Sequence, residues 1–142
     1  MTAEENKRRT RRVPDEVFNQ GNLALADELF TADYIEHAPL PPVFPPGLDG
    51  LKAFVTALRA AFPDFRYTVE DEIAEGDRVV IRVTASGTQS GEFLGIPAAG
   101  KKAVWSETHI ARVVDGKIVE HWVDQDRLGM LEQLGIVPTP GG

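Results

Sequence analysis

Residues 103–125 read Ala-Val-Trp-Ser-Glu-Thr-His-Ile-Ala-Arg-Val-Val-Asp-Gly-Lys-Ile-Val-Glu-His-Trp-Val-Asp-Gln. Apolar and polar residues alternate on both sides of Asp115-Gly116, and this dipeptide favours a two-residue hairpin turn. The stretch therefore predicts two antiparallel strands, over residues 103–114 and 117–125. With such a turn Val114 lies opposite Lys117, and the register places His109 opposite Trp122.

One face of the predicted hairpin combines aromatic and acidic side chains, because residues two apart on a strand share a face with the residues directly opposite. This face holds Trp105, Glu107, His109, Ile118, Glu120, Trp122, Asp124 and Asp126. A core face would be aliphatic, and a solvated face rarely holds both tryptophans, so we expect an aromatic pocket with polar groups inside. The other face, which includes Ile110, Arg112 and His121, suits packing or a subunit interface. A one-residue slip of the register would exchange the two faces.

The polar residues of the expected pocket are candidates for acid–base chemistry. Carboxylates enclosed by aromatic side chains tend to have raised pKa values and can transfer protons. Asp126 and Asp124 therefore qualify, although Asp126 also precedes a predicted helix and could be its N-cap. His109 could hydrogen-bond a substrate oxygen or simply pack against an aromatic ring, and His37 could reach the cavity mouth or cap a turn. The expected substrate-binding residues are His37, Trp105, Glu107, Trp122, Asp124 and Phe18.

The chain before this hairpin predicts helices first and strands afterwards. Residues 14–30 suit two short helices broken at Gly21-Asn22, and residues 49–62 have the apolar spacing of a longer helix that Pro63 ends. A proline-rich loop, residues 38–47, separates them. Strands are expected over 66–73 and 79–85, an irregular connection over 87–100, and a short helix near 128–134. This order predicts an α+β fold in which helices cover a curved antiparallel sheet that encloses a cavity.

Composition limits the function classes that the chain can belong to. Its 142 residues suit one domain, assigned to residues 13–142, and the basic residues Lys7 to Arg12 are expected to form a mobile, solvated arm over residues 1–12. A net charge of −7 disfavours nucleic acid as a partner. Cysteine is absent, and the three histidines lack a metal-ligand spacing, so we expect no metal. No nucleotide-binding glycine motif, seryl nucleophile elbow, export signal or membrane span is recognisable, which predicts a cytoplasmic protein without a cofactor.

Three segments resemble the SnoaL-like polyketide cyclase family, also called ester cyclases. They are Gly91-Glu-Phe-Leu-Gly-Ile-Pro-Ala-Ala-Gly-Lys101, Ile110-Ala-Arg-Val-Val-Asp-Gly-Lys-Ile-Val-Glu-His-Trp122 and Asp126-Arg-Leu-Gly-Met-Leu-Glu-Gln-Leu-Gly135. The resemblance extends upstream to residues 22–30, 34–37 and 49–62. It implies the cone-shaped α+β fold of the nuclear transport factor 2-like superfamily, with a homodimeric or homotetrameric assembly.

The resemblance also implies an activity, namely a cofactor-free intramolecular aldol condensation that closes the last ring of an aromatic polyketide methyl ester. Asp126 stands where the family's acid–base aspartate follows the Glu-x-Trp motif, here Glu120-His-Trp122. His109 would hydrogen-bond the developing oxyanion, while Trp105 and Trp122 would stack on the planar substrate.

Two other functions fit the same fold. An epoxide hydrolase could use Arg112 with Asp124 and Asp126 to activate water, although the predicted register puts Arg112 on the wrong face. A binding protein could hold a small aromatic ligand in the cavity without turnover.

Overall fold

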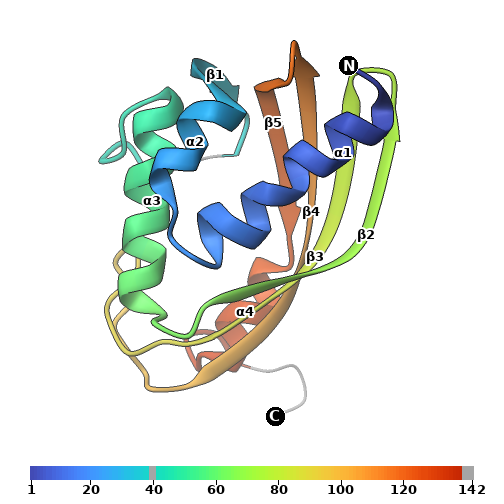
Figure 1. The fold of residues 1–142 in the computed structure, drawn as a ribbon. Coiled ribbons are helices and arrows are strands. Elements are labelled where there is room, and N and C mark those ends of the chain that lie inside the picture. Colours follow the sequence, from blue (N-terminus) through green and yellow to red (C-terminus); the bar gives the residue numbers. More distant parts are fainter. Residues whose placement is uncertain (39–40, 139–142) are drawn as a thin grey trace.

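The computed structural model describes residues 1–38 and 41–138 (Figure 1). The elements follow in the order α1 (Ala3–Arg12), the π-helix η1 (Val13–Phe18), α2 (Leu23–Leu29), β1 (Phe30–Glu36), α3 (Gly47–Ala61), β2 (Arg66–Glu75), β3 (Arg78–Thr88), β4 (Lys102–Val114), β5 (Lys117–Gln125) and α4 (Arg127–Gln133). This is the α+β order that the sequence predicts. Residues 39 and 40 of the proline-rich loop lie outside the described residues, and residues 41–46 form turns without a regular element.

The strands form one curved sheet in the order β1-β5-β4-β3-β2. Figure 1 shows α1, α2 and α3 across one side of this sheet, which we call the helix-facing side, and α4 near one end of it. Strands β2 to β5 are antiparallel neighbours, but β1 pairs with β5 in parallel. The expectation of a purely antiparallel sheet is therefore wrong at this edge, where no strand was predicted. The side chains of Phe30 and Tyr34 are buried on the same face of β1 and hold the strand against the core.

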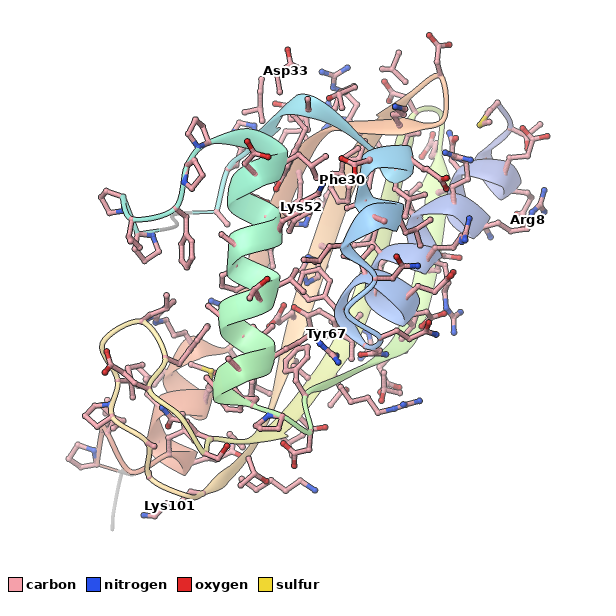
Figure 2. All side chains as sticks on the ribbon, turned by 60° about the vertical axis from the view of Figure 1, so that its left-hand side comes forward. Arg8, Phe30, Asp33, Lys52, Tyr67 and Lys101 are labelled. Atoms are coloured by element: carbon pink, nitrogen blue, oxygen red, sulfur yellow. The ribbon has the colours of Figure 1, made fainter. Side chains whose placement is uncertain are left out.

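The N-terminal residues form helix α1 and not the expected mobile arm. Thr2 and Glu5 make a capping box, and the basic residues of the last turn favourably oppose the helix dipole. The Arg9 side chain donates to the carbonyl oxygens of Gly116 (2.6 Å) and Glu28 (2.8 Å), while Asn6 and Thr10 are buried. Arg9 thus joins the helix to the rest of the fold, and Arg8 is exposed on its outside (Figure 2).

The helical break at Gly21-Asn22 is confirmed. Gly21 has a left-handed backbone conformation (φ +69°), and the Asn22 side chain accepts a hydrogen bond from the Leu25 backbone at 3.2 Å. Helix α3 begins two residues earlier than expected and buries its apolar stripe, which includes Leu51, Val55 and Leu58. Among residues 1–38 and 41–138, no helix combines the length and the apolar character needed to cross a membrane.

The predicted hairpin exists, but its register is wrong beyond the first pairs. Asp115 (φ +50°) and Gly116 (φ +79°) form the turn. Val113 pairs with Ile118 as expected, and then Arg112 pairs with Glu120, so Val119 is an extra residue without a partner. This bulge shifts every later pair by one and places His109 opposite Val123, not Trp122.

The bulge decides which β5 side chains face the helices. His121 and Val123 share the helix-facing side with the buried Trp105, Glu107 and Ala111 of β4. Glu120 and Trp122 lie on the outer side of the sheet, together with Arg112. The face predicted from the sequence is therefore correct for β4 and reversed for β5 from Glu120 to Val123, while Asp124 near the end of the strand still lines the large chamber.

Candidate functional site

Two chambers lie between the helices and the sheet. The large chamber has a volume of about 300 Å³, and the small chamber, which extends beneath α1 and η1, has a volume of about 60 Å³. Six residues line both: Phe18, Glu36, Leu51, Tyr67, His109 and His121. Four of these six side chains are polar, so the wall common to both chambers is where chemistry can occur.

Four side chains on the helix-facing side are joined by hydrogen bonds in one row, which we call the acid–base row: Glu36, His121, His109 and Glu107. A Glu36 carboxylate oxygen lies 2.6 Å from His121 Nδ1. His121 Nε2 lies 2.8 Å from His109 Nδ1, and His109 Nε2 lies 2.8 Å from Glu107 Oε1. Strands β1, β5 and β4 each contribute to this row, which depends on the bulge at Val119 because the bulge turns His121 inward.

Glu107 is buried and surrounded by hydrogen-bond donors. The Tyr67 hydroxyl donates to Oε1 at 2.8 Å, and the Trp105 indole N–H donates to Oε2 at 2.7 Å. Burial alone would raise the pKa of Glu107, but the hydrogen bonds from His109, Tyr67 and Trp105 outweigh it and lower the pKa. Glu107 is therefore an ionised carboxylate inside the protein. Burial and this adjacent charge raise the pKa of Tyr67, which stays a neutral donor.

Glu36 is the second carboxylate of the row. Burial again acts to raise its pKa, and hydrogen bonds from His121, the Ala38 backbone and Tyr34 more than compensate, so the pKa of Glu36 is lowered. Tyr34 donates to Oε1 at 3.1 Å, and burial beside this carboxylate raises the pKa of Tyr34. Burial lowers the pKa of His121, and the negative charge of Glu36 opposes this effect. The two histidines thus lie between two ionised carboxylates.

Aromatic side chains form much of the large chamber. The Phe54 and Phe93 rings lie 6.0 Å apart, and the Phe65 and Trp105 rings lie 6.3 Å apart. All four line the chamber, and Leu58 and Met130 add aliphatic surface. Asp124, Gln125 and Arg127 are exposed polar residues that also line it. A planar apolar ligand can therefore contact aromatic rings while its polar groups face the acid–base row or the exposed residues.

Four of the residues selected from the sequence come together here. Glu107 is hydrogen-bonded to both His109 and Trp105. Phe18 packs on Tyr67 with ring centroids 5.0 Å apart. Figure 2 shows Tyr67 between the helices and the sheet, where it joins Phe18 to the acid–base row.

Asp126 lies where the alternative interpretation of the sequence placed it, at the start of the C-terminal helix. It is the N-cap of α4, and its Oδ1 accepts the Gly129 backbone N–H at 2.9 Å. The residue is exposed, and within the described part of the chain neither chamber is lined by it. Asp124, two residues earlier, does line the large chamber. The acid–base role of Asp126 stays a prediction.

His37 and Trp122 lie together on the outer side of the sheet. Their rings are stacked with centroids 4.7 Å apart, and the Arg78 guanidinium lies 5.0 Å from the centre of the Trp122 ring. His37 Nε2 is 2.6 Å from Glu120, which also accepts from Arg112 at 2.9 Å. The predicted stacking of Trp122 on a ligand in the cavity is incompatible with this register, and Arg112 is likewise outside the cavity, as the sequence predicted.

Sequence reasoning missed His121, Glu36 and Tyr67. His121 was assigned to the other face because the bulge is not visible in the Asp115-Gly116 turn. Glu36 was missed because the strand of residues 30–36 was missed. One signal was available: Glu36-His37 and Glu120-His121 are two Glu-His dipeptides, and pairing them in neighbouring strands brings each glutamate to a histidine.

The donor set of the site offers no arrangement for a metal ion. In the part of the chain that the structure describes, no three His, Asp or Glu side chains are grouped as metal ligands. The ring nitrogens of the acid–base row instead hydrogen-bond to each other and to the two carboxylates.

The fold and the site together define a class of protein. A curved sheet and helices enclose an aromatic chamber with an internal acid–base row, which is typical of cone-shaped α+β proteins that bind or convert small molecules. The sequence identifies the family: a model of the SnoaL-like polyketide cyclases matches residues 8–134, and the chain belongs to this family. It is an enzyme of the polyketide cyclase type. The resemblance stated from the sequence motifs is thus confirmed.

Known relatives agree with this assignment. The chain is 34% identical over 132 residues to the aklanonic acid methyl ester cyclase DnrD of Streptomyces peucetius, covering 89% of this chain and 90% of that protein. It is 31% identical over 119 residues to the nogalonic acid methyl ester cyclase of Streptomyces nogalater, covering 83% and 89%.

Solved structures confirm the fold. TsrD from Streptomyces laurentii superposes with a TM-score of 0.87 at 28% identity, over 96% of this chain and 99% of that one. Wild-type IdmH from Streptomyces antibioticus superposes with a TM-score of 0.79 at 35% identity, over 92% and 98%.

Proposed function

We propose that the protein closes a ring of an aromatic polyketide methyl ester by an intramolecular aldol reaction in the large chamber, without a cofactor. The observation that supports this most strongly is the acid–base row on the wall of an aromatic-lined space. Two relatives with more than 30% identity are named as cyclases of such methyl esters.

The aldol step requires one base and one acid. A base removes the proton from the carbon next to the ester carbonyl, and the electron pair of the broken C–H bond remains as an enolate. The enolate carbon attacks a ketone carbon of the same molecule, a C–C bond forms, and the resulting alkoxide takes up a proton. Atoms and electrons balance within the substrate, so an acid–base group and a fixed geometry suffice.

His109 is the group that we assign to this proton transfer. Its ring lines both chambers and lies beside the buried Glu107, which keeps it oriented. The sequence favoured Asp126 as the base. Asp126 is exposed, and its carboxylate already accepts a hydrogen bond from the Gly129 backbone N–H in α4, so these observations favour the histidine instead.

The aromatic walls hold the substrate in a reactive shape. Phe54, Phe93 and Trp105 offer ring faces and edges to a planar polyketide, and a folded chain brings its two reacting carbons together. Such positioning commonly supplies several kcal/mol of a barrier. Asp124 and Arg127 are available for the polar groups of the ligand at the exposed part of the chamber.

Incubation with aklanonic acid methyl ester and with nogalonic acid methyl ester tests the proposal. The aldol step leaves the mass unchanged, so the product is followed by its chromatographic retention and absorbance spectrum. An epoxide hydrolase would instead add the mass of one water to an epoxide substrate, and Arg112 is on the wrong side of the sheet to help it. Binding of both esters without turnover would support a carrier and contradict the proposal.

Two variants decide which residue is the base. Removal of a general acid–base group commonly costs about 10²- to 10⁴-fold in rate, and we expect this loss in kcat for His109→Asn. Asp126→Asn keeps the capping oxygen and therefore leaves α4 in place. A loss of turnover in Asp126→Asn with full activity in His109→Asn would assign the role to Asp126 and overturn our assignment.

A further inference from the structure

The hydrogen bonds of the acid–base row impose a count of protons. Three contacts join the row: Glu36 with His121 (2.6 Å), His121 with His109 (2.8 Å) and His109 with Glu107 (2.8 Å). Each contact needs one proton between its two heavy atoms. Because both carboxylates are ionised acceptors, the two outer contacts use the Nδ1–H of His121 and the Nε2–H of His109.

Two neutral imidazoles supply only these two protons. Their remaining nitrogens, His121 Nε2 and His109 Nδ1, then face each other at 2.8 Å with a lone pair on each. One added proton turns this contact into a hydrogen bond. A second added proton would place N–H groups against each other and two positive rings side by side, with ring centroids 5.1 Å apart. The pair therefore favours a single additional proton.

We propose that His121 is a further acid–base residue of this enzyme, and that His109 and His121 bind one proton between them and act as a single unit. Glu36 and Glu107 hold the outer N–H groups, so that the two facing nitrogens form the exchange site. The activity of this unit rests on the proposed aldol function.

The unit alternates between two forms during the reaction. In the proton-free form the pair takes up the proton that leaves the substrate C–H bond, whose electron pair remains as the enolate. The proton then lies between the two rings, where the hydrogen bond stabilises it. It is later transferred to the alkoxide oxygen, which restores the proton-free pair, so no proton is gained or lost.

The charged and titratable groups that face the pair are few. Strand β1 contributes Glu36 and Tyr34, β2 contributes Tyr67, and β4 contributes Glu107. The α1, η1 and α3 residues that line the small chamber beside the pair, such as Thr10, Phe18 and Leu51, do not titrate. Two negative carboxylates thus favour one positive charge, and burial disfavours a second, consistent with the lowered pKa of His121.

Nuclear magnetic resonance of ring-¹⁵N histidine counts the protons directly and needs no substrate. The chain has three histidines, and His37 lies on the outer side as an internal reference. On acidification from pH 9 to pH 5 we expect His109 and His121 to bind one proton in total, shared between the two rings. Two independent, complete titrations of His109 and His121 would overturn the proposal, even in an active enzyme.

Glu36→Gln tests the electrostatic part of the proposal in the active enzyme. The amide oxygen can still accept from His121, but the negative charge is lost. The pair then holds its proton less tightly. Because a base must be free of its proton, kcat/KM rises with pH through the pKa of the pair. We expect this rising limb of the pH profile to move to lower pH in Glu36→Gln, by about one pH unit.

Glu120→Gln is the matched control, because it changes a glutamate that also lies 2.6 Å from a histidine, His37, but on the outer side. It should leave the limb in place. An unmoved limb in Glu36→Gln, or an equal shift in both variants, would overturn the proposal. If the pair binds one proton but neither ester is cyclised, the proposed cyclase function is wrong, whereas the inference that the two histidines share one proton still holds.

Discussion

Tyr67→Phe tests how strongly the buried carboxylate of Glu107 depends on its donors. The substitution removes the hydroxyl that lies 2.8 Å from Glu107 Oε1 and keeps the ring that packs on Phe18 and Phe65. Glu107 is 5% exposed, so water cannot easily replace the lost donor. Hydrogen bonds to charged groups contribute about 1.5–3 kcal/mol to stability. Because His109 and Trp105 still bind the carboxylate, we expect Tyr67→Phe to lower the free energy of unfolding by about 2 kcal/mol at pH 7.

The loss should depend on pH with a defined sign. The pKa of Glu107 is lowered in the folded protein, so its hydrogen bonds stabilise the fold above the unfolded-state pKa, which is about 4.3 for glutamate. This stability disappears as the pH falls through the folded-state pKa. The difference between wild type and Tyr67→Phe should therefore be full at pH 7 and shrink below about pH 4, toward the value of a neutral hydrogen bond, about 1 kcal/mol.

Urea unfolding followed by tryptophan fluorescence, at several pH values from 7 to 3, measures this difference. Thr84→Val is the control, because it removes a hydroxyl that donates to Glu70 at 2.9 Å in an exposed setting. Water replaces that bond, and the free energy of unfolding should change by less than about 0.5 kcal/mol. A Tyr67→Phe loss no larger than that of the control, or one equal at pH 7 and pH 3, would refute the reasoning.

Three further predictions concern α4, the outer side of the sheet and the α3 start. Asp126→Ala removes the cap of α4 and should lower the free energy of unfolding by about 1 kcal/mol in the same urea assay, whereas Asp126→Asn, which still caps, should be nearly neutral. An apolar row crosses the outer side of the sheet through successive cross-strand partners, namely Ile73, Val80, Ile110 and Trp122. If the chain self-associates through this row, Ile110→Lys should lower the molecular mass measured by light scattering and lower the thermal midpoint by no more than a few degrees. An unchanged multimer would place the interface elsewhere. Gly50→Ala would drive its Cβ into the carbonyl oxygen of Pro45 and should lower the thermal midpoint, while an unchanged midpoint would show that this contact relaxes freely.

Local chemistry made most of the fold predictable. Gly21-Asn22 and Asp115-Gly116 act through their own backbone and side-chain preferences, so the helix break and the hairpin turn are visible in the sequence. The strand over residues 30–36 was missed because its partner, β5, is distant in sequence and parallel, and no turn signal marks such a pairing. The α1 residues were misjudged because their charges suggested solvation, while Arg9 satisfies its donors on backbone carbonyls from residues 28 and 116.

The candidate site was predictable on β4 and not on β5. The alternation of Trp105, Glu107 and His109 follows from the strand period alone, and these residues do share the helix-facing side. The assignment of β5 required knowledge of one extra residue, Val119, which reverses the faces of residues 120–123. An isolated hairpin has no reason to bulge at this point. The core supplies that reason, because the bulge places Ile118 and His121 on the same side of the sheet although only Val119 and Glu120 separate them.

The site depends on two register choices that act together. The parallel register pairs Glu36 with His121 on the helix-facing side, while His37 meets Glu120 on the outer side. If β1 slipped by one residue, Glu36 would pair with Glu120, and like charges directly opposed are destabilising. If the bulge were absent, Trp122 would take the inward position and His121 would leave the row. The same dipeptide, Glu-His, thus builds an acid–base pair inside the cavity and a hydrogen-bonded surface contact outside it. Which of the two can perform chemistry is decided by backbone register, and residue type alone does not distinguish them.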